Sequence, residues 1–238
     1  MRLDKLIAHM GYGTRSAAKK LIKSGAVLVN GALPSAADAH VDPERDEIRV
    51  FEEPVHYAEH VYYMMNKPPG VVSATVDRDF PTVVDLVPET YVRRGLFPVG
   101  RLDRDAVGLL LLTDDGALAH RLTSPRHAVE KEYEVRAQGV LTEADVERFA
   151  AGLLLEDGTP VRPARLEIVQ AGPESIARVT ITEGKYHQVK RMFLVIGKPV
   201  RHLKRVRIGP LLLDEGLSEG ALRPLTEPEV RALKEAAR

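Results

Sequence analysis

A polar loop directly ahead of an apolar strand holds the residues best suited to chemistry. The loop runs from Gly100 to Gly108 with the sequence GRLDRDAVG, and four leucines and Thr113-Asp114-Asp115-Gly116 follow it. A short apolar run closed by Asp-Asp-Gly is typical of a buried strand that ends in a turn. The loop therefore places Asp103 and Asp105 at the edge of a core. There a neighbouring cation can hold a carboxylate charged for nucleophilic or electrostatic catalysis.

Lys190 is a second candidate because of its place on a helix predicted over residues 186–196. The buried stripe of this helix should consist of four residues at i, i+3, i+4 and i+7, namely Val189, Met192, Phe193 and Ile196. Lys190 lies on the border of the stripe, so it can be half-buried beside a carboxylate. Arg191 points nearly opposite, so we expect it to face solvent and phosphate. On spacing alone, Lys190 is equally well an ordinary lysine at the edge of a core.

The composition excludes several classes of protein and site. The chain has 238 residues and no cysteine, so disulfides and thiolate catalysis are excluded. The sequence has no apolar run of about 18 residues, which excludes a transmembrane helix. The first residues lack the apolar core of a signal peptide, and the eight histidines have no ligand spacing. We expect a cytoplasmic protein without a bound metal.

The charged residues are unevenly distributed along a chain whose net charge is zero. The N-terminal stretch up to Asn30 carries one acid, Asp4, and six bases: Arg2, Lys5, Arg15, Lys19, Lys20 and Lys23. The stretch between Glu183 and Asp214 has no acid and eight bases: Lys185, Lys190, Arg191, Lys198, Arg201, Lys204, Arg205 and Arg207. Two such stretches are typical of a polyanion-binding surface, and the alternative is two solvated faces.

The first fifty residues have the pattern of a small αβ module. Apolar spacing predicts helices over 3–10 and 15–24, the second capped by Thr14. Strands are predicted at 27–29 and 46–50, with a hairpin turn at Asn30-Gly31. Four bases lie mainly off the apolar side of the second helix and suit a phosphate backbone: Arg15, Lys19, Lys20 and Lys23. We assign 1–51 to this module and 52–60 to a linker.

Residues 61–238 form the second predicted domain. Strands are expected at 61–65, 109–112, 130–135, 165–169, 175–182 and 199–208. Helices are expected at 116–122, 142–152, 186–196 and from Thr226 to the end, and a loop from Thr90 to Gly95. Most connections are short enough for antiparallel pairing. The prediction is an α+β fold with a mainly antiparallel mixed sheet flanked by helices.

Three separate motifs resemble one known family. The string GRLDRDAVGLLLLTDDG resembles the catalytic-aspartate motif of the pseudouridine synthases, and within them the RsuA-type ribosomal RNA enzymes. Ala106 departs from the usual Thr, and we expect a small effect on the loop. The strand and Asn66-Lys67-Pro68 turn resemble the start of that catalytic domain. The N-terminal pattern resembles the RNA-binding module first described in ribosomal protein S-four, which RsuA-type enzymes also carry.

The resemblance implies a role for each site residue. Asp103 corresponds to the nucleophile, Tyr133 to the aromatic that stacks on the target base, and Lys190 to the basic residue beside the aspartate. Arg101 corresponds to the arginine that helps to hold the nucleotide out of the helix. Without the resemblance, Tyr133 is equally well an ordinary strand aromatic in the core.

The implied reaction breaks the N1–C1′ bond of uridine, turns the uracil and bonds C5 to C1′. It is redox-neutral and uses neither a metal nor a nucleotide cofactor, so no cofactor is expected. Asp103 can attack C1′ or the ring, or a ribose proton can be removed to give a glycal. The base that accepts the C5 proton is not identified by the sequence.

The predicted partner is ribosomal RNA or a partly assembled ribosomal subunit, bound by a monomer. The segments 124–127 and 186–193 look more like the small-subunit branch, so 16S rRNA is favoured over large-subunit rRNA. One alternative is a non-catalytic RNA-binding assembly factor on the same scaffold. Another is a hydrolytic enzyme that uses Asp103 with Asp105, although alternate positions on one loop tend to diverge.

Overall fold

The computed structural model of the chain describes residues 1–55, 57–88 and 95–238. It divides the chain into two compact units, Met1–Val61 with Val87–Leu96, and Tyr62–Leu86 with Phe97–Arg238. The predicted loop from Thr90 to Gly95 lies outside the described residues, apart from Gly95. No helix among the described residues is long and apolar enough to cross a membrane.

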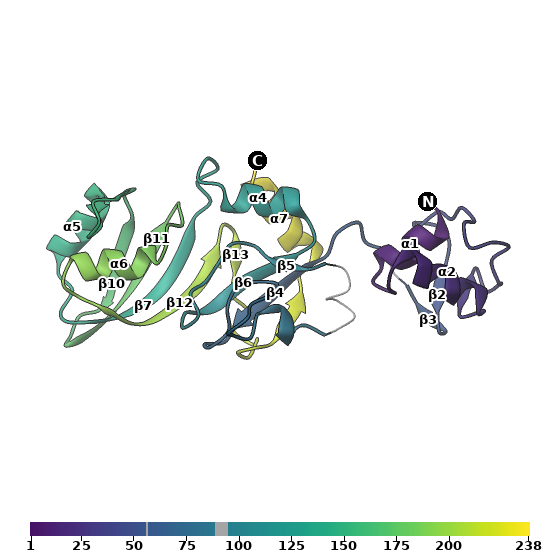
Figure 1. Cartoon of the computed structure of the whole chain (residues 1–238). Coiled ribbons are helices and arrows are strands. Elements are labelled where there is room, and N and C mark those ends of the chain that lie inside the picture. The colour runs from purple at the N-terminus through teal and green to yellow at the C-terminus, as the bar shows by residue number, and fades with distance from the viewer. Residues whose placement is uncertain (56, 89–94) are drawn as a thin grey trace. The chain divides into compact units, whose positions relative to one another are not determined.

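The first unit packs two helices on a small antiparallel sheet (Figure 1). The helices are α1 (Leu3–His9) and α2 (Arg15–Lys23), and the Thr14 side chain caps α2 by accepting from the Ala17 amide at 3.3 Å. The strands are β1 (Val27–Val29), β2 (Ile48–Val50) and β3 (Glu53–Pro54). The core of the unit consists of buried apolar residues: Leu3, Leu6, Ile7, Ala18, Ile22, Val27, Val41, Ile48 and Val50.

Two details of this unit differ from the local sequence pattern. The turn at Asn30 and Gly31 makes a single bridge between Val29 and Ala32, and the main partner of β1 is β2. β3 lies in residues 52–60, the stretch predicted as a linker, and it pairs with β2. Residue 56 of that stretch is not described. The main pairing of β1 is therefore with β2, which is distant in sequence, and not across the adjacent turn.

The second unit is built on a nine-stranded sheet with the order β10-β11-β7-β12-β6-β4-β14, to which β13 and β5 add at β12 and β6. The strands are β4 (Tyr62–Lys67), β5 (Phe97–Pro98), β6 (Val107–Thr113), β7 (Lys131–Gln138), β10 (Arg165–Gln170), β11 (Glu174–Ile181), β12 (Val200–Ile208), β13 (Leu211–Leu212) and β14 (Leu222–Pro224). The short strands β8 (Leu153–Leu154) and β9 (Pro160–Val161) pair separately. The pairs are antiparallel except β12 with β6, which confirms the predicted α+β class.

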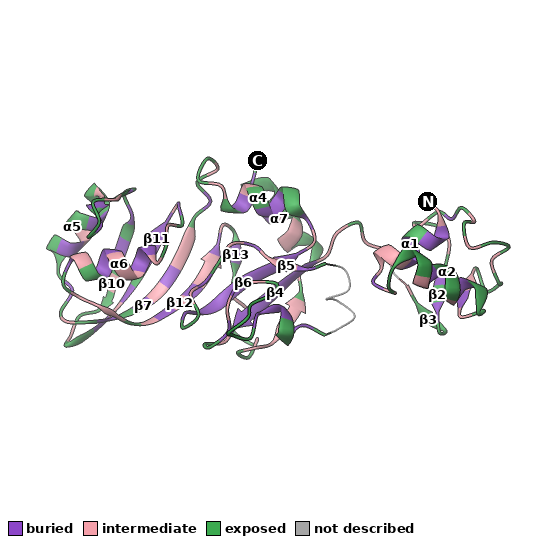
Figure 2. Ribbon diagram, in the orientation of Figure 1, coloured by how far each residue is buried: buried purple, intermediate pink, exposed green. Residues whose placement is uncertain are grey.

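Helices pack around this sheet in two groups. α4 (Gly116–Thr123) and α7 (Glu227–Ala236) share a core with β4 and β6 through Leu118 and Leu233. α5 (Glu143–Ala151) contacts α6 (Gln188–Val195) through Phe149 and Phe193, whose rings are 5.2 Å apart. A short 3₁₀ turn, η1 (Val84–Leu86), follows β4 along the chain. The central strands β4 and β6 are almost wholly buried (Figure 2).

The single parallel pair brings β12 against the start of β6. Arg205 pairs with Gly108, and a Cβ atom built on Gly108 would lie 2.3 Å from the Arg205 carbonyl oxygen. Gly108 also has a positive φ of 100°, which side-chain-bearing residues rarely adopt. Glycine at 108 therefore permits the close approach that brings the polar loop to β12.

Candidate active site

A cavity of about 590 Å³ opens in the second unit where the polar loop, β7, β12 and the start of α6 meet. The loop lines it with Arg101, Asp103 and Arg104. The strands contribute Tyr133 from β7 and Arg205 from β12. The cavity therefore collects polar groups from three segments that are distant in the sequence.

Asp103 lies at the centre of a charged cluster in this cavity. Its Oδ2 is 3.2 Å from Lys190 Nζ, and its Oδ1 is 3.5 Å from His187 Nε2. The Asp103 side chain is 22 % exposed, so it is partly withdrawn from water without being sealed off. Tyr133 is buried and lines the same cavity. The structure thus brings together Asp103, Lys190 and Tyr133, as the sequence predicts.

Lys190 is half-buried, as predicted, and its ammonium contacts two carboxylates. Nζ lies 2.5 Å from Asp105 Oδ1, closer than to Asp103. Burial acts to lower the pKa of Lys190, but the hydrogen bonds and charges of Asp105 and Asp103 outweigh it and raise that pKa. Burial likewise acts to raise the pKa of Asp105, and the contact with Lys190 outweighs it and lowers that pKa. The expectation that the two aspartate side chains diverge is wrong, because both point to one ammonium.

Lys67 is a supporting residue that the sequence reasoning identified only as part of a turn. It is fully buried, and its ammonium donates to the carbonyl oxygens of Pro68 at 2.9 Å, Arg104 at 3.2 Å and Ala106 at 2.8 Å. Burial lowers the pKa of Lys67 to about 8. The available signal was a lysine two positions after an apolar run, directly before two prolines.

Arg205 supports the other side of the loop from β12. It is 2 % exposed, and its Nε donates to the Leu109 carbonyl oxygen at 2.8 Å. Nη1 is 3.5 Å from the Arg101 carbonyl oxygen, and Nη2 is buried with no hydrogen-bond partner among the described residues. Arg101 itself is exposed and lines the cavity.

The structure corrects the prediction for Arg191. Its Nε lies 2.6 Å from Glu156 Oε1, and its Nη2 lies 2.6 Å from Asp157 Oδ2. The Arg191 side chain is 15 % exposed, so it does not face solvent as a free cation. Two nearby carboxylates compensate the charge that was predicted to attract RNA phosphate.

The second basic stretch is largely paired with acids from other segments. Arg207 contacts Glu130 and Glu132, and Lys198 contacts Asp145. Lys185 contacts Glu183 at 3.7 Å. Although residues 184–213 contain no acid, acidic side chains from outside this stretch therefore lie beside several of its bases.

The basic residues of the first unit remain exposed. Lys20 and Lys23 lie on the solvent side of α2. Arg15 and Lys19 are about half exposed, and both approach Asp4, at 3.2 Å and 3.9 Å. Asp4 is wholly buried, and its pKa is lowered chiefly by the hydrogen bond from Arg2. A single buried carboxylate thus orients part of an exposed cationic face.

The described residues contain no group of three or more His, Cys, Asp and Glu side chains placed to hold a metal ion. The charged side chains that line the cavity include the carboxylate of Asp103 and the guanidinium groups of Arg101 and Arg205. The arrangement can hold one carboxylate charged beside an ammonium, next to an aromatic ring. That chemistry suits a nucleophile or a stabiliser of developing positive charge.

Comparison with known families agrees with this geometry. Residues 61–194 match the family described as RNA pseudouridylate synthase, and residues 1–33 match the S4 domain. The chain is 46 % identical to an uncharacterized RNA pseudouridine synthase, YtzG, of Bacillus subtilis over 99 % of both proteins. It is 41 % identical to ribosomal small subunit pseudouridine synthase A of Escherichia coli, covering 98 % of this chain and all of that protein.

Haemophilus influenzae has a similar relative. Its ribosomal small subunit pseudouridine synthase A is 42 % identical over 98 % of this chain and 99 % of that protein. A crystal structure of a pseudouridylate synthase is 41 % identical, with a TM-score of 0.69, and the match covers 98 % of this chain and 99 % of that one. The similarity therefore extends over both units of the chain.

Proposed function

This chain belongs to the RNA pseudouridine synthases and isomerises uridine to pseudouridine in RNA, and on that premise we propose that its substrate is small-subunit ribosomal RNA. The proposal is supported by the full-length similarity to enzymes named for the small ribosomal subunit in E. coli and H. influenzae. The S4 match of residues 1–33 supports RNA as the partner.

The observation that carries the catalytic proposal is the contact between Lys190 and Asp103, a residue that lines the same cavity as Tyr133. We propose that Asp103 is the nucleophile, that Lys190 holds it charged, and that Tyr133 stacks on the uracil. An aromatic contact of this kind contributes about 1–3 kcal/mol per base, which offsets part of the cost of extruding the nucleotide. Arg101, exposed at the cavity, would help to keep the nucleotide out of its helix.

The reaction can be followed bond by bond at this site. The N1–C1′ bond breaks, the uracil turns while it remains in the cavity, and C5 bonds to C1′. C5 then loses its proton and N1 gains one, so atoms and electrons balance without an external reactant. Asp103 stabilises the sugar or the ring covalently, or the ribose passes through a glycal. In each route the carboxylate reacts in its charged form, and the Lys190 ammonium lies 3.2 Å from it, where it can balance that charge.

We further propose that residues 1–51 bind RNA, that 61–238 form the catalytic domain, and that 52–60 join them. The matches to the two families, at 1–33 and at 61–194, support this division. In this proposal the protein acts in the cytoplasm as a monomer on ribosomal RNA or on a partly assembled subunit. The exposed Arg15, Lys19, Lys20 and Lys23 would contact the RNA backbone.

The substrate proposal is tested by tritium release from C5-labelled uridine. The purified protein is given 16S rRNA, 23S rRNA and partly assembled small subunits as separate substrates. We expect release from the small-subunit RNA, naked or in particles, and none from 23S rRNA. Release from 23S rRNA alone would assign the protein to the large-subunit branch. No release from any RNA, despite binding, would favour a non-catalytic assembly factor.

A further inference from the structure

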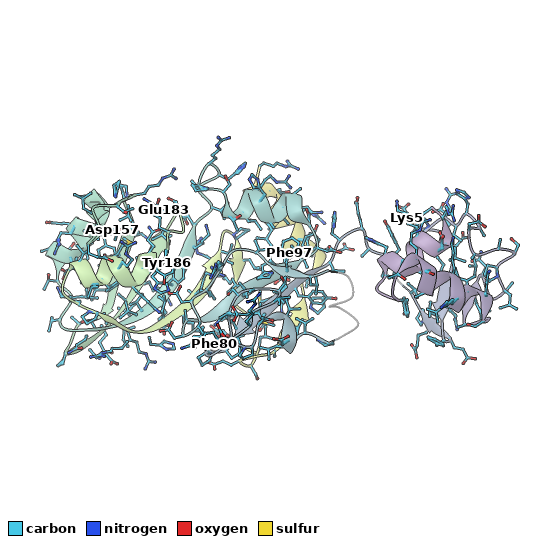
Figure 3. The ribbon with its side chains drawn as sticks, in the orientation of Figure 1. Lys5, Phe80, Phe97, Asp157, Glu183 and Tyr186 are labelled. Carbon is cyan, nitrogen blue, oxygen red and sulfur yellow. The ribbon has the colours of Figure 1, made fainter. Side chains whose placement is uncertain are left out.

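Tyr186 is a large aromatic side chain that stands exposed at the rim of the catalytic cavity. Its side chain is 75 % exposed, yet it lines the same cavity as Asp103. It lies next to the start of α6 (Figure 3). Its ring is stacked on that of His187, with centroids 3.9 Å apart and planes 15° apart. One face of the tyrosine ring is thus supported, and the high exposure leaves the rest open to a ligand.

The backbone holds this pair in an unusual conformation. His187 has φ 48° and ψ 32°, the left-handed region that residues with a side chain seldom adopt. Such a conformation costs on the order of 1–3 kcal/mol and persists where the surrounding structure enforces it, often at functional sites. Here Gln188 enforces it, because its side chain accepts from the Lys185 amide at 2.9 Å and donates to Glu183 at 3.0 Å.

The stacked pair is connected directly to the catalytic carboxylate. His187 Nε2 lies 3.5 Å from Asp103 Oδ1, so Tyr186, His187 and Asp103 form a continuous series of contacts from the rim to the centre. A uracil beside Asp103 would fill the interior of the cavity. A base on the exposed side of Tyr186 would therefore lie outside that interior, in the same cavity lining.

Phe80, labelled in Figure 3, gives a useful comparison because it is also an exposed aromatic and contacts the polar loop through Arg104. The guanidinium of Arg104 lies 4.0 Å over the centre of its ring. That face of Phe80 is therefore occupied by a cation from the loop itself. Tyr186 instead rests with one face on the His187 ring and is otherwise exposed, as a stacking platform requires.

We propose that Tyr186 stacks on the base of a nucleotide adjacent to the target uridine. This inference rests on the proposed function, since it assumes RNA with one nucleotide extruded into the cavity. Extrusion removes a stacking partner from the neighbouring base, and an aromatic platform restores about 1–3 kcal/mol in a manner that tolerates any base. The platform would also fix the position of His187 beside Asp103 when the RNA binds.

The test combines variants of Tyr186 with RNA that lacks single bases. Tyr186→Ala and Tyr186→Phe are compared with wild type on a short RNA fragment containing the modified uridine, taken from the RNA in which wild type releases tritium. We expect Tyr186→Ala to lower kcat/KM about 5- to 150-fold, and Tyr186→Phe to stay within about twofold of wild type. Thermal unfolding checks that each variant is folded. We expect both to fold, because the Tyr186 side chain is exposed.

The decisive arm replaces one nucleotide beside the uridine by an abasic one. For wild type, an abasic residue on one side should lower kcat/KM by about the same factor as Tyr186→Ala, whereas the alanine variant should show no additional loss there. Independent effects of the two changes would overturn the proposal. An equal decrease in kcat/KM for Tyr186→Phe and Tyr186→Ala would also overturn it. That result would mean that the hydroxyl group, and not the ring, makes the contact with RNA. If the wild type modifies a different RNA, only the substrate assignment fails, and the same comparison is decisive on that RNA.

Discussion

Lys190 Nζ lies 3.2 Å from Asp103 Oδ2 and at the same time contacts Asp105 at 2.5 Å. The two carboxylates differ in exposure, since the Asp103 side chain is 22 % exposed and that of Asp105 is 74 % exposed. A single ammonium thus joins a sheltered carboxylate to an open one. The contact with Lys190 lowers the pKa of Asp105, so this carboxyl is poorly suited to be the proton donor that a hydrolytic acid–base pair needs.

Asp105→Asn should therefore reduce activity only modestly. Removing the exposed carboxylate leaves Lys190 to Asp103 alone, so we expect kcat/KM to fall less than about tenfold. Tritium release from labelled RNA measures this, with Asp103→Asn as the matched control on the same loop. Loss of activity in Asp105→Asn as complete as in Asp103→Asn would mean that both carboxylates take part in the chemistry.

Lys67→Met should destabilise the catalytic unit. The substitution keeps the apolar stem but leaves three carbonyl oxygens of the loop and its neighbour without their donor, while it removes a buried charge. We expect a decrease of about 2–4 kcal/mol in the free energy of unfolding, measured by urea denaturation. Lys20→Met, at an exposed position, is the control. A change below about 1 kcal/mol at Lys67 would show that these hydrogen bonds contribute little.

Two lysines that are wholly or partly withdrawn from water, Lys67 and Lys131, should make stability depend on pH in the alkaline range. Burial lowers the pKa of Lys67 and of Lys131 to about 8, from 10.5 in the unfolded chain. Between these values the unfolded state binds more protons, so the free energy of unfolding should rise with pH. Lys190, whose pKa is raised, loses its contribution only above about 10.5 and does not affect this window.

Lys131→Met tests this linkage, because it removes one of the two groups. Urea unfolding at several pH values from about 7.5 to 9.5 should show a smaller rise for the variant than for wild type. Lys20→Met again serves as the exposed control. Equal slopes for all three proteins would contradict the assignment of a depressed pKa to Lys131.

RNA affinity should depend on the exposed bases of α2 and not on Arg191. Lys20→Gln and Lys23→Gln should each weaken RNA binding and lower the slope of log K against log salt by about 0.7–0.9. Arg191→Gln should leave that slope unchanged, since Glu156 and Asp157 already pair with the arginine. Filter binding at several salt concentrations gives these slopes. A larger slope change for Arg191→Gln than for Lys20→Gln would contradict this division.

The elements that follow a local period could be predicted from the sequence. Val189, Met192, Phe193 and Ile196 are buried as a helical stripe requires, and this geometry placed Lys190 at its border. The alternation of apolar residues in β7 and β11 predicted these two strands in the same way. These predictions succeed because the angle between residues of one element is fixed by backbone geometry.

The parts that failed depend on contacts between distant segments. Arg191 was expected to face solvent, but its partners come from the turn at residues 156–157, far away in sequence. Asp105 converges with Asp103 because the loop turns back on itself, with the Ala106 amide 3.1 Å from the Asp103 carbonyl oxygen. Lys67 supports the loop only through tertiary packing. No local pattern encodes such pairings, so these contacts could not be predicted from the sequence.

The most direct measurement compares Asp103→Asn with wild type in both RNA binding and tritium release from C5-labelled small-subunit rRNA. The amide has nearly the size of the carboxylate and lacks its charge and nucleophilicity, so fold and RNA affinity should be retained. We expect release to fall by at least about 10³-fold. Turnover close to that of wild type in a folded, RNA-binding variant would contradict the role of Asp103 as the catalytic carboxylate.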